Sequence, residues 1–339
     1  MNIQPPLIGI TMGDPAGIGP EIIHSSLTKS SIYKICRPVV FGDAKMLHAA
    51  KKFTGSTLDI SIIDEPDDGL FKCGTIDVIN LSGLDPEKIN LGLSSAETGK
   101  ALILYINAAV EAAKKKKISA IVTCPVNKRS MQMSGSKFHG HTELLAERTG
   151  VLDYAMMLAG KMLRVVLVTI HIPLKNVPLT LSSEKILKTI RITGESLQER
   201  FGIKNPRIAV AGLNPHAGED GMFGTEEKNT ILPAIKAALM EGFNVSGPFP
   251  PDTVFYNAVQ GDYDAVVCMY HDQGLIPFKL IHFTDGVNTT LGLPVIRTSV
   301  DHGTAYDIAG KGRADPGSLV AAIQMAVHQA VVLGKNNAE

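Results

Sequence analysis

The chain has 339 residues, of which 45% are hydrophobic, with 33 Lys and Arg against 33 Asp and Glu. This length suggests about two domains with a large core, and the composition excludes wholesale disorder. The net charge is zero, whereas nucleic-acid-binding proteins usually carry an excess of basic residues. The apolar runs are interrupted too often for a membrane span, and no two of the four cysteines form a CxxC pair. We therefore expect a cytoplasmic globular protein with neither a nucleic-acid nor a membrane partner.

Apolar runs typical of strands alternate with segments of helical periodicity. In chain order we predict strands at Leu7–Met12, Pro38–Phe41, Ile118–Cys124, Leu163–Ile170, Arg207–Leu213 and Asp264–Tyr270. We predict helices at Glu21–Thr28, Ala96–Lys117, Ser183–Phe201, Glu226–Gly242 and Ser318–Leu333. This alternation favours an α/β protein with a largely parallel, helix-covered sheet.

Three of the ten histidines each follow one of these apolar runs, at His171, His216 and His271. Ligands of open α/β sheets collect at the carboxyl ends of strands, so three imidazoles placed there can converge on one ion. Three histidines with an open fourth position are typical of a catalytic metal site. Zinc, cobalt, nickel or manganese suits such ligands better than magnesium. The alternative is that the three are separate polar residues at strand ends.

A glycine-rich segment, residues 13–21, follows the first strand and leads into a helix. Glycines let the backbone approach a ligand, and a helix N-terminus favours anions. The segment matches neither GxxxxGK[ST] nor GxGxxG. It is either a ligand-binding loop or a tight structural turn.

Two further polar segments are candidate sites. In Gly140–Glu143, Thr142 either caps the following helix or joins His141 in holding a substrate oxygen. The run from Arg297 to Gly312 is polar and glycine-rich, and we interpret it as a functional surface loop. Arginine and lysine side chains bind phosphate or carboxylate groups, which makes Lys279 and Arg297 candidates for an anion site.

Several long motifs resemble the 4-hydroxythreonine-4-phosphate dehydrogenase (PdxA) family from end to end. They are ITMGDPAGIGPEI, GHTELLAERTG, GLNPHAGEDGMFGTEE, PPDTVF, MYHDQG and GLPVIRTSVDHGTAYDIAGKG. The first and last are also similar to segments of isopropylmalate dehydrogenases. The resemblance implies the isocitrate/isopropylmalate dehydrogenase-like α/β/α fold, which has two domains with a cleft between them and binds nicotinamide without GxGxxG. We expect one domain from residues 1–128 and 276–339 on the cofactor side, and a central domain at 129–275 with the metal ligands and dimer contacts.

The resemblance also implies roles for individual residues. It places one divalent metal (Zn, Co, Mn, Ni or Mg) on His171, His216 and His271, the three histidines that follow apolar runs. It places substrate contacts at His141, Thr142, Lys279, Asn288 and Arg297. It implies NAD or NADP contacts at Gly13, Asp14, His302, Gly303, Thr304, Asp307 and Gly310. Asp252 and Asp272 are candidates to orient ligand histidines.

The implied substrate is a phosphorylated four-carbon hydroxy acid, and the implied assembly is a homodimer with its active site at the subunit interface. The implied reaction is oxidation of 4-phosphooxy-L-threonine by NAD(P)+, with metal assistance, followed by decarboxylation to 3-amino-2-oxopropyl phosphate, in pyridoxal phosphate biosynthesis. His141, Lys279 and Asp272 remain alternatives for the general base.

Three other functions remain open from the sequence. Within the family, the alternative is a D-threonate or D-erythronate 4-phosphate dehydrogenase. From another class, a metal-dependent hydrolase would also use an ion with an open position, although the GTAYDIAGKG segment argues against it. The last alternative is a non-catalytic scaffold.

Overall fold

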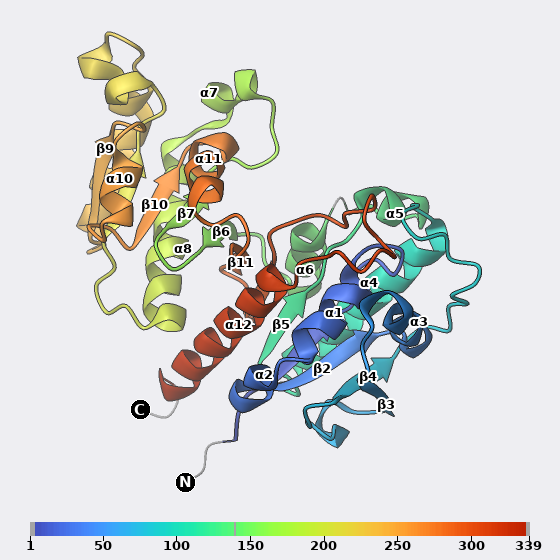
Figure 1. Ribbon diagram of the computed structural model, residues 1–339. Helices are drawn as coiled ribbons and strands as arrows, with labels where there is room; N and C mark the ends of the chain where they lie inside the picture. Colours follow the sequence, from blue (N-terminus) through green and yellow to red (C-terminus); the bar gives the residue numbers. More distant parts are fainter. Residues whose placement is uncertain (1–3, 139, 337–339) are drawn as a thin grey trace. The chain divides into compact units, whose positions relative to one another are not determined.

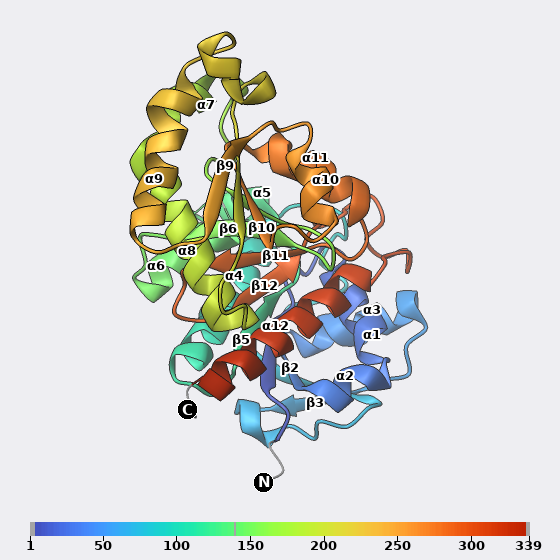
Figure 2. The ribbon, with the colours of Figure 1, turned by 90° about the vertical axis from the view of Figure 1, so that its left-hand side faces the viewer.

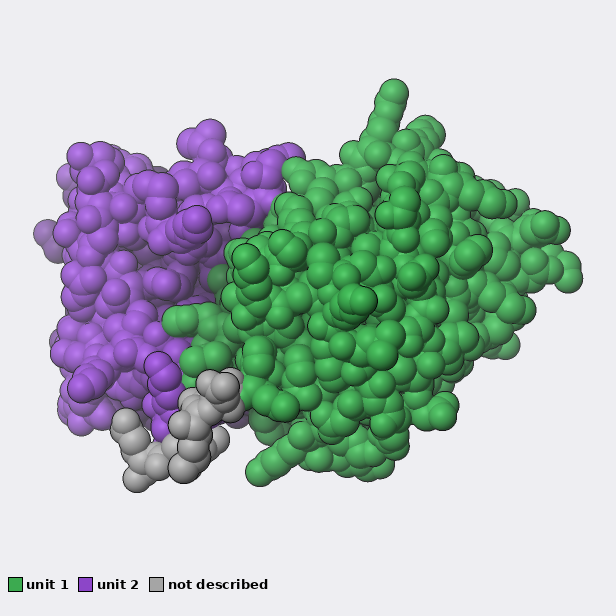
Figure 3. All heavy atoms as spheres, turned by 60° about the horizontal axis from the view of Figure 1, so that its bottom comes forward, with its two compact units in different colours: residues 1–152, 293–331 green, residues 153–292, 332–339 purple. Residues whose placement is uncertain are grey.

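The structure is a computed structural model that describes residues 4–138 and 140–336 (Figure 1). The chain divides into two compact units, coloured separately in Figure 3. Unit 1 comprises residues 1–152 and 293–331, and unit 2 comprises residues 153–292 and 332–339. The chain therefore leaves unit 1 after Leu152 and re-enters it at Leu293.

The six strands of unit 1 lie in the order β3-β4-β2-β1-β5-β12. Their bounds are β1 Leu7–Thr11, β2 Arg37–Gly42, β3 Asp59–Ile63, β4 Thr75–Asn80, β5 Ala120–Thr123 and β12 Arg297–Val300. Every neighbouring pair among them is parallel. All residues of β1, β5 and β12 are buried, as expected for strands of a parallel sheet that is covered on both faces.

The helices of unit 1 are α1 Gly19–Leu27, α2 Ser30–Ile35, α3 Ala44–Thr54, α4 Ala96–Lys114, α5 Lys128–Met133, α6 His141–Thr149 and most of α12 Gly317–Asn336, with a 3-10 turn at Pro66–Asp68. Their ends follow ordinary capping chemistry. The Asp43 side chain accepts the N–H of Met46 to start α3, and Gly55 ends that helix at φ 64°. Helix α4 packs on β1, β2 and β5, whereas α1 packs on α3 and β4.

The six strands of unit 2 lie in the order β11-β6-β7-β10-β8-β9. Their bounds are β6 Ala155–Ala159, β7 Arg164–Leu167, β8 Ile208–Ala211, β9 Val245–Phe249, β10 Ala265–Cys268 and β11 Val287–Leu291. Strand β6 is antiparallel to β7 and to β11. The antiparallel β6–β7 pair follows from the short connection between these two strands, which reverses the chain. The pairs β7–β10, β10–β8 and β8–β9 are parallel.

The helices of unit 2 are α7 Val177–Thr180, α8 Ser183–Phe201, α9 Leu232–Met240, α10 Val254–Val259 and α11 His271–Ile281, with short turns at Leu174–Asn176, Pro215–Gly221 and Glu227–Ile231. Within this unit, α8 and α9 lie on one side of β9 and β10, and α10 and α11 lie on the other (Figure 2). Val165, Ala209 and Val266, from three adjacent strands, belong to one buried cluster with Val254 of α10 and Phe278 of α11.

The boundaries between the two units lie after Leu152 and Gly292. They fall later in the chain than the domain boundaries expected from the sequence, which were placed after residues 128 and 275. Helix α6 packs on α4, so residues up to Leu152 belong to unit 1. Strand β11 pairs with β6, so residues up to Gly292 belong to unit 2.

The prediction of an α/β protein is confirmed, and α8 begins and ends where the sequence predicts. Two local expectations are wrong. The residues Arg297–Val300 are not surface loop but a fully buried strand, β12, paired with β5. The helix predicted at Glu226–Gly242 is divided into a π-helical turn at Glu227–Ile231 and α9. Strands β3, β4, β6, β9, β11 and β12 were not predicted.

Among the described residues, α12 is the one helix whose length and composition would let it cross a membrane. This is weak support for a span, because core helices pass the same test. Leu319, Ala322, Ile323 and Ala326 are fully buried, and the carbonyl of Ala322 accepts the Thr298 hydroxyl of β12. Packing against unit 1 accounts for the apolar character of α12.

Candidate active site

The three histidines that follow apolar runs all belong to unit 2. His171 comes after β7, His216 after β8 and His271 after β10. Strand β10 lies between β7 and β8 and is parallel to both. The three segments therefore leave the sheet at the same edge, where α/β proteins bind their ligands.

His171 and His271 lie close to each other. Their ring centres are 5.6 Å apart, and the ring planes are tilted by 42°. Both line a hollow of about 260 Å³, together with Thr169, Ile170, Ile172, Leu174, Val177, Tyr270 and Asp272. Two imidazoles that share one zinc ion through bonds of about 2.0–2.1 Å have ring centres roughly 5 Å apart. The separation of His171 and His271 fits such a pair.

Carboxylates orient two of the three histidines. Nδ1 of His271 lies 2.7 Å from Oδ1 of Asp272, and Nδ1 of His216 lies 3.2 Å from Oε2 of Glu219. When Nδ1 donates to a carboxylate, Nε2 is left as the atom that can bind a metal. This is the arrangement expected of Asp272. Asp252, the other candidate, is exposed in the turn before α10.

His216 does not join the other two within one chain. Its imidazole lies against Phe223, with ring centres 6.0 Å apart, and its side chain is 64% exposed. Over residues 4–138 and 140–336, no group of three potential metal-ligating side chains is assembled. A single chain therefore brings two of the three imidazoles together.

Unit 1 carries a second polar centre, formed by His141 and Arg297. His141 is the first residue of α6, and Arg297 is the first residue of β12. Burial, together with the positive charge of Arg297, holds the pKa of His141 well below its usual value, although a hydrogen bond to the Cys124 backbone acts in the opposite direction. The ring is therefore neutral near pH 7.

The hydrogen bonding of His141 identifies its tautomer. Its Nε2 atom is buried and has no hydrogen-bond partner, so the bond to the backbone of Cys124 comes from Nδ1. In a neutral ring that donates from Nδ1, Nε2 is an acceptor. A buried acceptor without a partner is unfavourable by roughly 1–3 kcal/mol, so the site favours a ligand that brings a donor.

Arg297 is a buried cation, only 2% exposed. Its Nη2 atom donates to the Thr123 hydroxyl at 2.8 Å. Burial lowers the pKa of Arg297 to about 9, which leaves the guanidinium charged at neutral pH. An anionic ligand beside Arg297 would offset the free-energy cost of burying this charge.

The other expected substrate residues are divided between the units. Thr142 is in unit 1, and because Gly140 is the N-cap of α6 without a side-chain bond, the capping alternative for Thr142 is wrong. Lys279 and Asn288 are in unit 2, on α11 and β11. Lys279 Nζ lies 5.6 Å from the centre of the Phe283 ring, and the amide oxygen of Asn288 is buried without a hydrogen-bond partner.

The expected cofactor segments, 13–21 and 302–312, are bonded to each other in unit 1. Asp14 is fully buried; its Oδ1 accepts the Ala16 N–H, and its Oδ2 accepts the hydroxyl of Tyr306 at 2.8 Å. Gly13 has φ +73°, and a Cβ there would lie 2.3 Å from the Pro125 carbonyl oxygen, so only glycine fits. Asp14 thus joins the two segments.

The remaining residues of the 302–312 segment differ in exposure. His302, Gly303 and Asp307 are exposed, whereas Thr304 is buried. The N–H of Gly310 donates to the Glu21 carboxylate at 2.6 Å, and the N–H of Gly312 does so at 2.8 Å. Glu21 therefore fixes the end of this segment.

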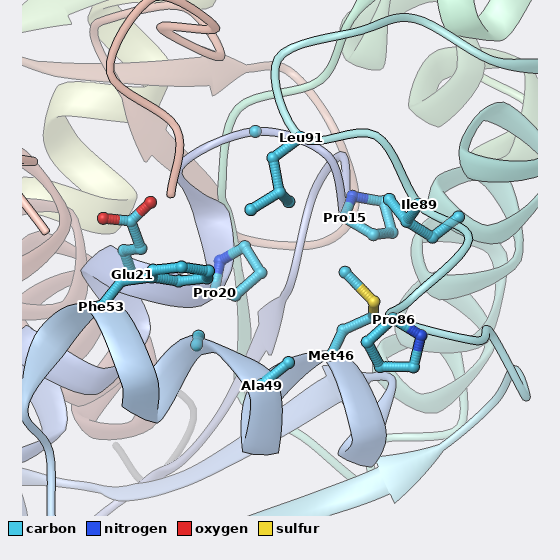
Figure 4. A pocket seen from close by; sticks show the side chains of 11 residues that line it. Pro15, Pro20, Glu21, Met46, Ala49, Phe53, Pro86, Ile89 and Leu91 are labelled. Carbon is cyan, nitrogen blue, oxygen red and sulfur yellow. The ribbon is translucent and has the colours of Figure 1, made fainter. Parts of the chain in front are cut away.

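An apolar pocket of about 90 Å³ adjoins these segments in unit 1 (Figure 4). Its walls come from residues 15–21, from α3 and from the 86–91 loop; Leu91 and Met46 point into it (Figure 4). Glu21 is the one charged residue in the lining.

Sequence reasoning missed three buried polar residues, each of which bonds a different segment of the chain: Glu21, His282 and Glu227. Nε2 of His282 accepts the backbone N–H of Met162, and Nδ1 of His282 lies 3.1 Å from Oδ1 of Asp285. Glu21 and Glu227 lie inside the quoted motifs, so their position there was a usable signal. His282 lies outside them and gave none.

Comparisons with known proteins agree with this architecture. The family model "Pyridoxal phosphate biosynthetic protein PdxA" matches residues 34–326. A 4-hydroxythreonine-4-phosphate dehydrogenase of Desulforapulum autotrophicum is 58% identical over 99% of each chain. A D-threonate 4-phosphate dehydrogenase of Cupriavidus necator is 50% identical over 94% of this chain and 96% of its own.

A solved structure extends the similarity to the fold. The crystal structure of 4-hydroxythreonine-4-phosphate dehydrogenase from Klebsiella pneumoniae has a TM-score of 0.89 and 43% identity, covering 97% of this chain and 99% of that one. With a family model matched over most of the chain and relatives similar over its full length, this chain belongs to the PdxA family.

Proposed function

We propose that the protein oxidises 4-phosphooxy-L-threonine with NAD(P)+ and decarboxylates the product to 3-amino-2-oxopropyl phosphate, as a step of pyridoxal phosphate biosynthesis. The observation that carries this proposal is the pair His171 and His271, 5.6 Å apart after neighbouring parallel strands and in one hollow. The similarity to dehydrogenases over the full chain favours oxidation over the hydrolase alternative.

His171, His216 and His271 would hold one divalent metal. The donor set fits, because all three are imidazoles and two of them have carboxylates at Nδ1. When bound, the metal would supply positive charge to polarise an alcohol or ketone oxygen, and NAD(P)+ would accept the hydride. His171 and His271 meet within one chain. The third ligand, His216, would reach the metal when two subunits assemble.

His141 would accept a proton or a hydrogen bond from the substrate. Its Nε2 atom is a buried acceptor, and its depressed pKa keeps this atom unprotonated at neutral pH. A general base must be free of a proton before it reacts. These properties favour His141 over Lys279 and Asp272.

The anionic groups of the substrate would bind Arg297 and Lys279, with Thr142 and Asn288 supplying neutral hydrogen bonds. Arg297 is suited to a carboxylate or phosphate because its guanidinium is buried and charged. The buried amide oxygen of Asn288 would accept a donor such as the substrate amine. NAD or NADP would lie against the 13–17 and 302–310 segments.

We also place the protein in the cytoplasm as a homodimer whose active site forms at the interface. Cys36, Cys124 and Cys268 are free and buried, consistent with a reducing compartment. Ile276 and Leu280 of α11 and the following Phe283 are spaced four and three residues apart and are 68%, 87% and 78% exposed. An apolar stripe of this kind is typical of a protein interface.

The second candidate is a D-threonate 4-phosphate dehydrogenase, favoured by the 50% identity to such an enzyme. Purified protein assayed with NAD+ or NADP+ against 4-phosphooxy-L-threonine and D-threonate 4-phosphate, by absorbance at 340 nm, decides between them. We expect the higher kcat/KM with 4-phosphooxy-L-threonine. Higher kcat/KM with D-threonate 4-phosphate would establish the second candidate, and no reduced nicotinamide with either would overturn both.

The metal ligands have a direct test. His216→Ala should lower the bound metal, measured by elemental analysis, and remove turnover, because one of three ligands is lost. His328→Ala, a histidine on α12 outside the proposed site, is the matched control. Full metal content and turnover in His216→Ala would contradict the ligand assignment.

A further inference from the structure

The turn that carries His216 has an unusual backbone. Five successive residues, 216–220, have φ values of 53°, 54°, 81°, 40° and 53°. Four of them are not glycine, and the left-handed conformation is unfavourable by roughly 1–2 kcal/mol for each such residue. A turn of this kind persists only where its surroundings hold it in place.

The Glu227 carboxylate holds the chain where it enters this turn. Its Oε1 atom accepts the backbone N–H groups of Leu213 and Asn214, both at 2.7 Å. Its Oε2 atom accepts the side-chain Nδ2 of Asn214 at 2.9 Å. Glu227 is only 6% exposed and begins a π-helical turn, a feature frequent at functional sites.

The turn is closed tightly around this carboxylate. A Cβ at Gly218 would lie 2.6 Å from Oε2 of Glu227, and one at Gly212 would lie 3.2 Å from Oε1. The backbone carbonyl of Asn214 in turn accepts the N–H of Ala217 at 3.2 Å. The carboxylate therefore contacts the strand end, the entry residue and the turn itself.

We propose that Glu227 is a positioning residue: its carboxylate holds the left-handed turn that presents His216 to the metal. The inference rests on the proposed function, because it takes His216 as a ligand. Glu219 orients the imidazole ring through Nδ1, whereas Glu227 fixes the backbone from which the ring projects.

The test compares Glu227→Ala, Glu227→Gln and the matched control Glu226→Gln. Glu226 is adjacent and also accepts Asn214 Nδ2, at 2.8 Å, but it bonds neither backbone N–H of residues 213 and 214. The metal-stripped, full-length protein is titrated with Co²⁺ and followed by calorimetry and visible absorbance. The thermal midpoint of each apo variant is measured separately.

We expect Glu227→Ala to weaken Co²⁺ binding about 10–100-fold, the usual effect of losing a partner that orients a ligand. Glu227→Gln keeps one acceptor oxygen and should weaken binding about three- to tenfold, and Glu226→Gln should bind as the wild type does. A purely structural role would lower the thermal midpoint and leave the Co²⁺ affinity of the folded protein unchanged, which would overturn the proposal.

Two further variants keep the outcomes distinct. If Glu227→Ala does not fold, the variants Glu227→Gln and Asn214→Ala test the positioning role instead. Wild-type affinity for Co²⁺ in both of them would reject this role of Glu227. His216→Ala in the same titration tests the underlying assignment. Wild-type Co²⁺ affinity in His216→Ala would refute the metal ligand, whereas loss there with no effect at Glu227 would refute only the positioning role.

Discussion

At the scale of single residues, burial decides the chemistry of the polar centre in unit 1. Arg297 stays charged although it is almost fully buried, whereas desolvation of its ring and the charge of Arg297 hold His141 neutral. The two residues are therefore suited to different tasks, one to bind an anion and the other to accept a proton.

The anion-binding role of Arg297 predicts a large effect of Arg297→Met, which keeps much of the volume and removes the charge. Truncating one partner of a buried charge pair costs about 2–5 kcal/mol, so KM for the phosphorylated substrate should rise at least about 30-fold. The KM for NAD(P)+ measured in parallel is the control. A change confined to the cofactor KM would contradict the role.

The neutral state of His141 predicts a dependence of stability on pH. Because the pKa in the folded protein lies below 6.5, the unfolded chain takes up the proton first as pH falls. The stability associated with neutral His141 is present above pH 6.5 and is lost as pH falls toward the depressed value. Between pH 8 and pH 5, the thermal midpoint should fall less in His141→Gln than in the wild type.

The same measurement has an internal reference. Burial also lowers the pKa of His24, which bonds the carbonyl of Leu47 and is intact in both proteins. Its contribution to acid sensitivity therefore cancels in the comparison. Parallel declines of the thermal midpoint in the two proteins would show that His141 does not contribute to the acid sensitivity.

At the scale of elements, α11 links two parts of the proposed site. It begins at His271 and carries Lys279 in its last turn. His282, at its end, contacts the connection between β6 and β7 through the Met162 N–H and packs on Phe278, with ring centres 5.3 Å apart. The carboxyl end of α11 is thus tied to the sheet by one buried imidazole.

Gly160→Ala tests this attachment. A Cβ at Gly160 would lie 2.4 Å from Cγ of His282, so the ring must move, and overpacking of this kind costs about 1–3 kcal/mol. We expect a thermal midpoint lower by several degrees and a raised KM for the phosphorylated substrate. Gly83→Ala is the control, because Gly83, like Gly160, is not at positive φ and its Cβ would meet nothing within 4 Å; an equal effect there would contradict the steric explanation.

At the scale of the whole molecule, the exposed stripe Ile276, Leu280 and Phe283 predicts association. The double variant Ile276→Asp and Leu280→Asp should be monomeric by light scattering coupled to size exclusion, because buried charges without partners oppose an interface. Leu152→Asp, at a 93% exposed position of unit 1, is the control. A double variant that remains dimeric would place the interface elsewhere.

The fold class, the family and the candidate site residues could all be predicted from the amino-acid sequence. Fully buried parallel strands appear as continuous apolar runs, which is why β7, β8 and β10 were recognised with the histidines that follow them. By contrast, β11, with the sequence VNTTL, and β9, with glycine and proline, have no such run. Their place in the sheet depends on partners distant in the chain.

Which side chains meet, in contrast, could be read only from the folded chain. It brings His171 and His271 together across 100 residues of chain but leaves His216 apart from them within a single chain. It also made Arg297 part of a buried strand, because β12 pairs with β5, a contact that no local pattern encodes. Residue types and their spacing specify what chemistry is available, whereas long-range packing fixes burial, and burial sets the charge state and the partners of each group.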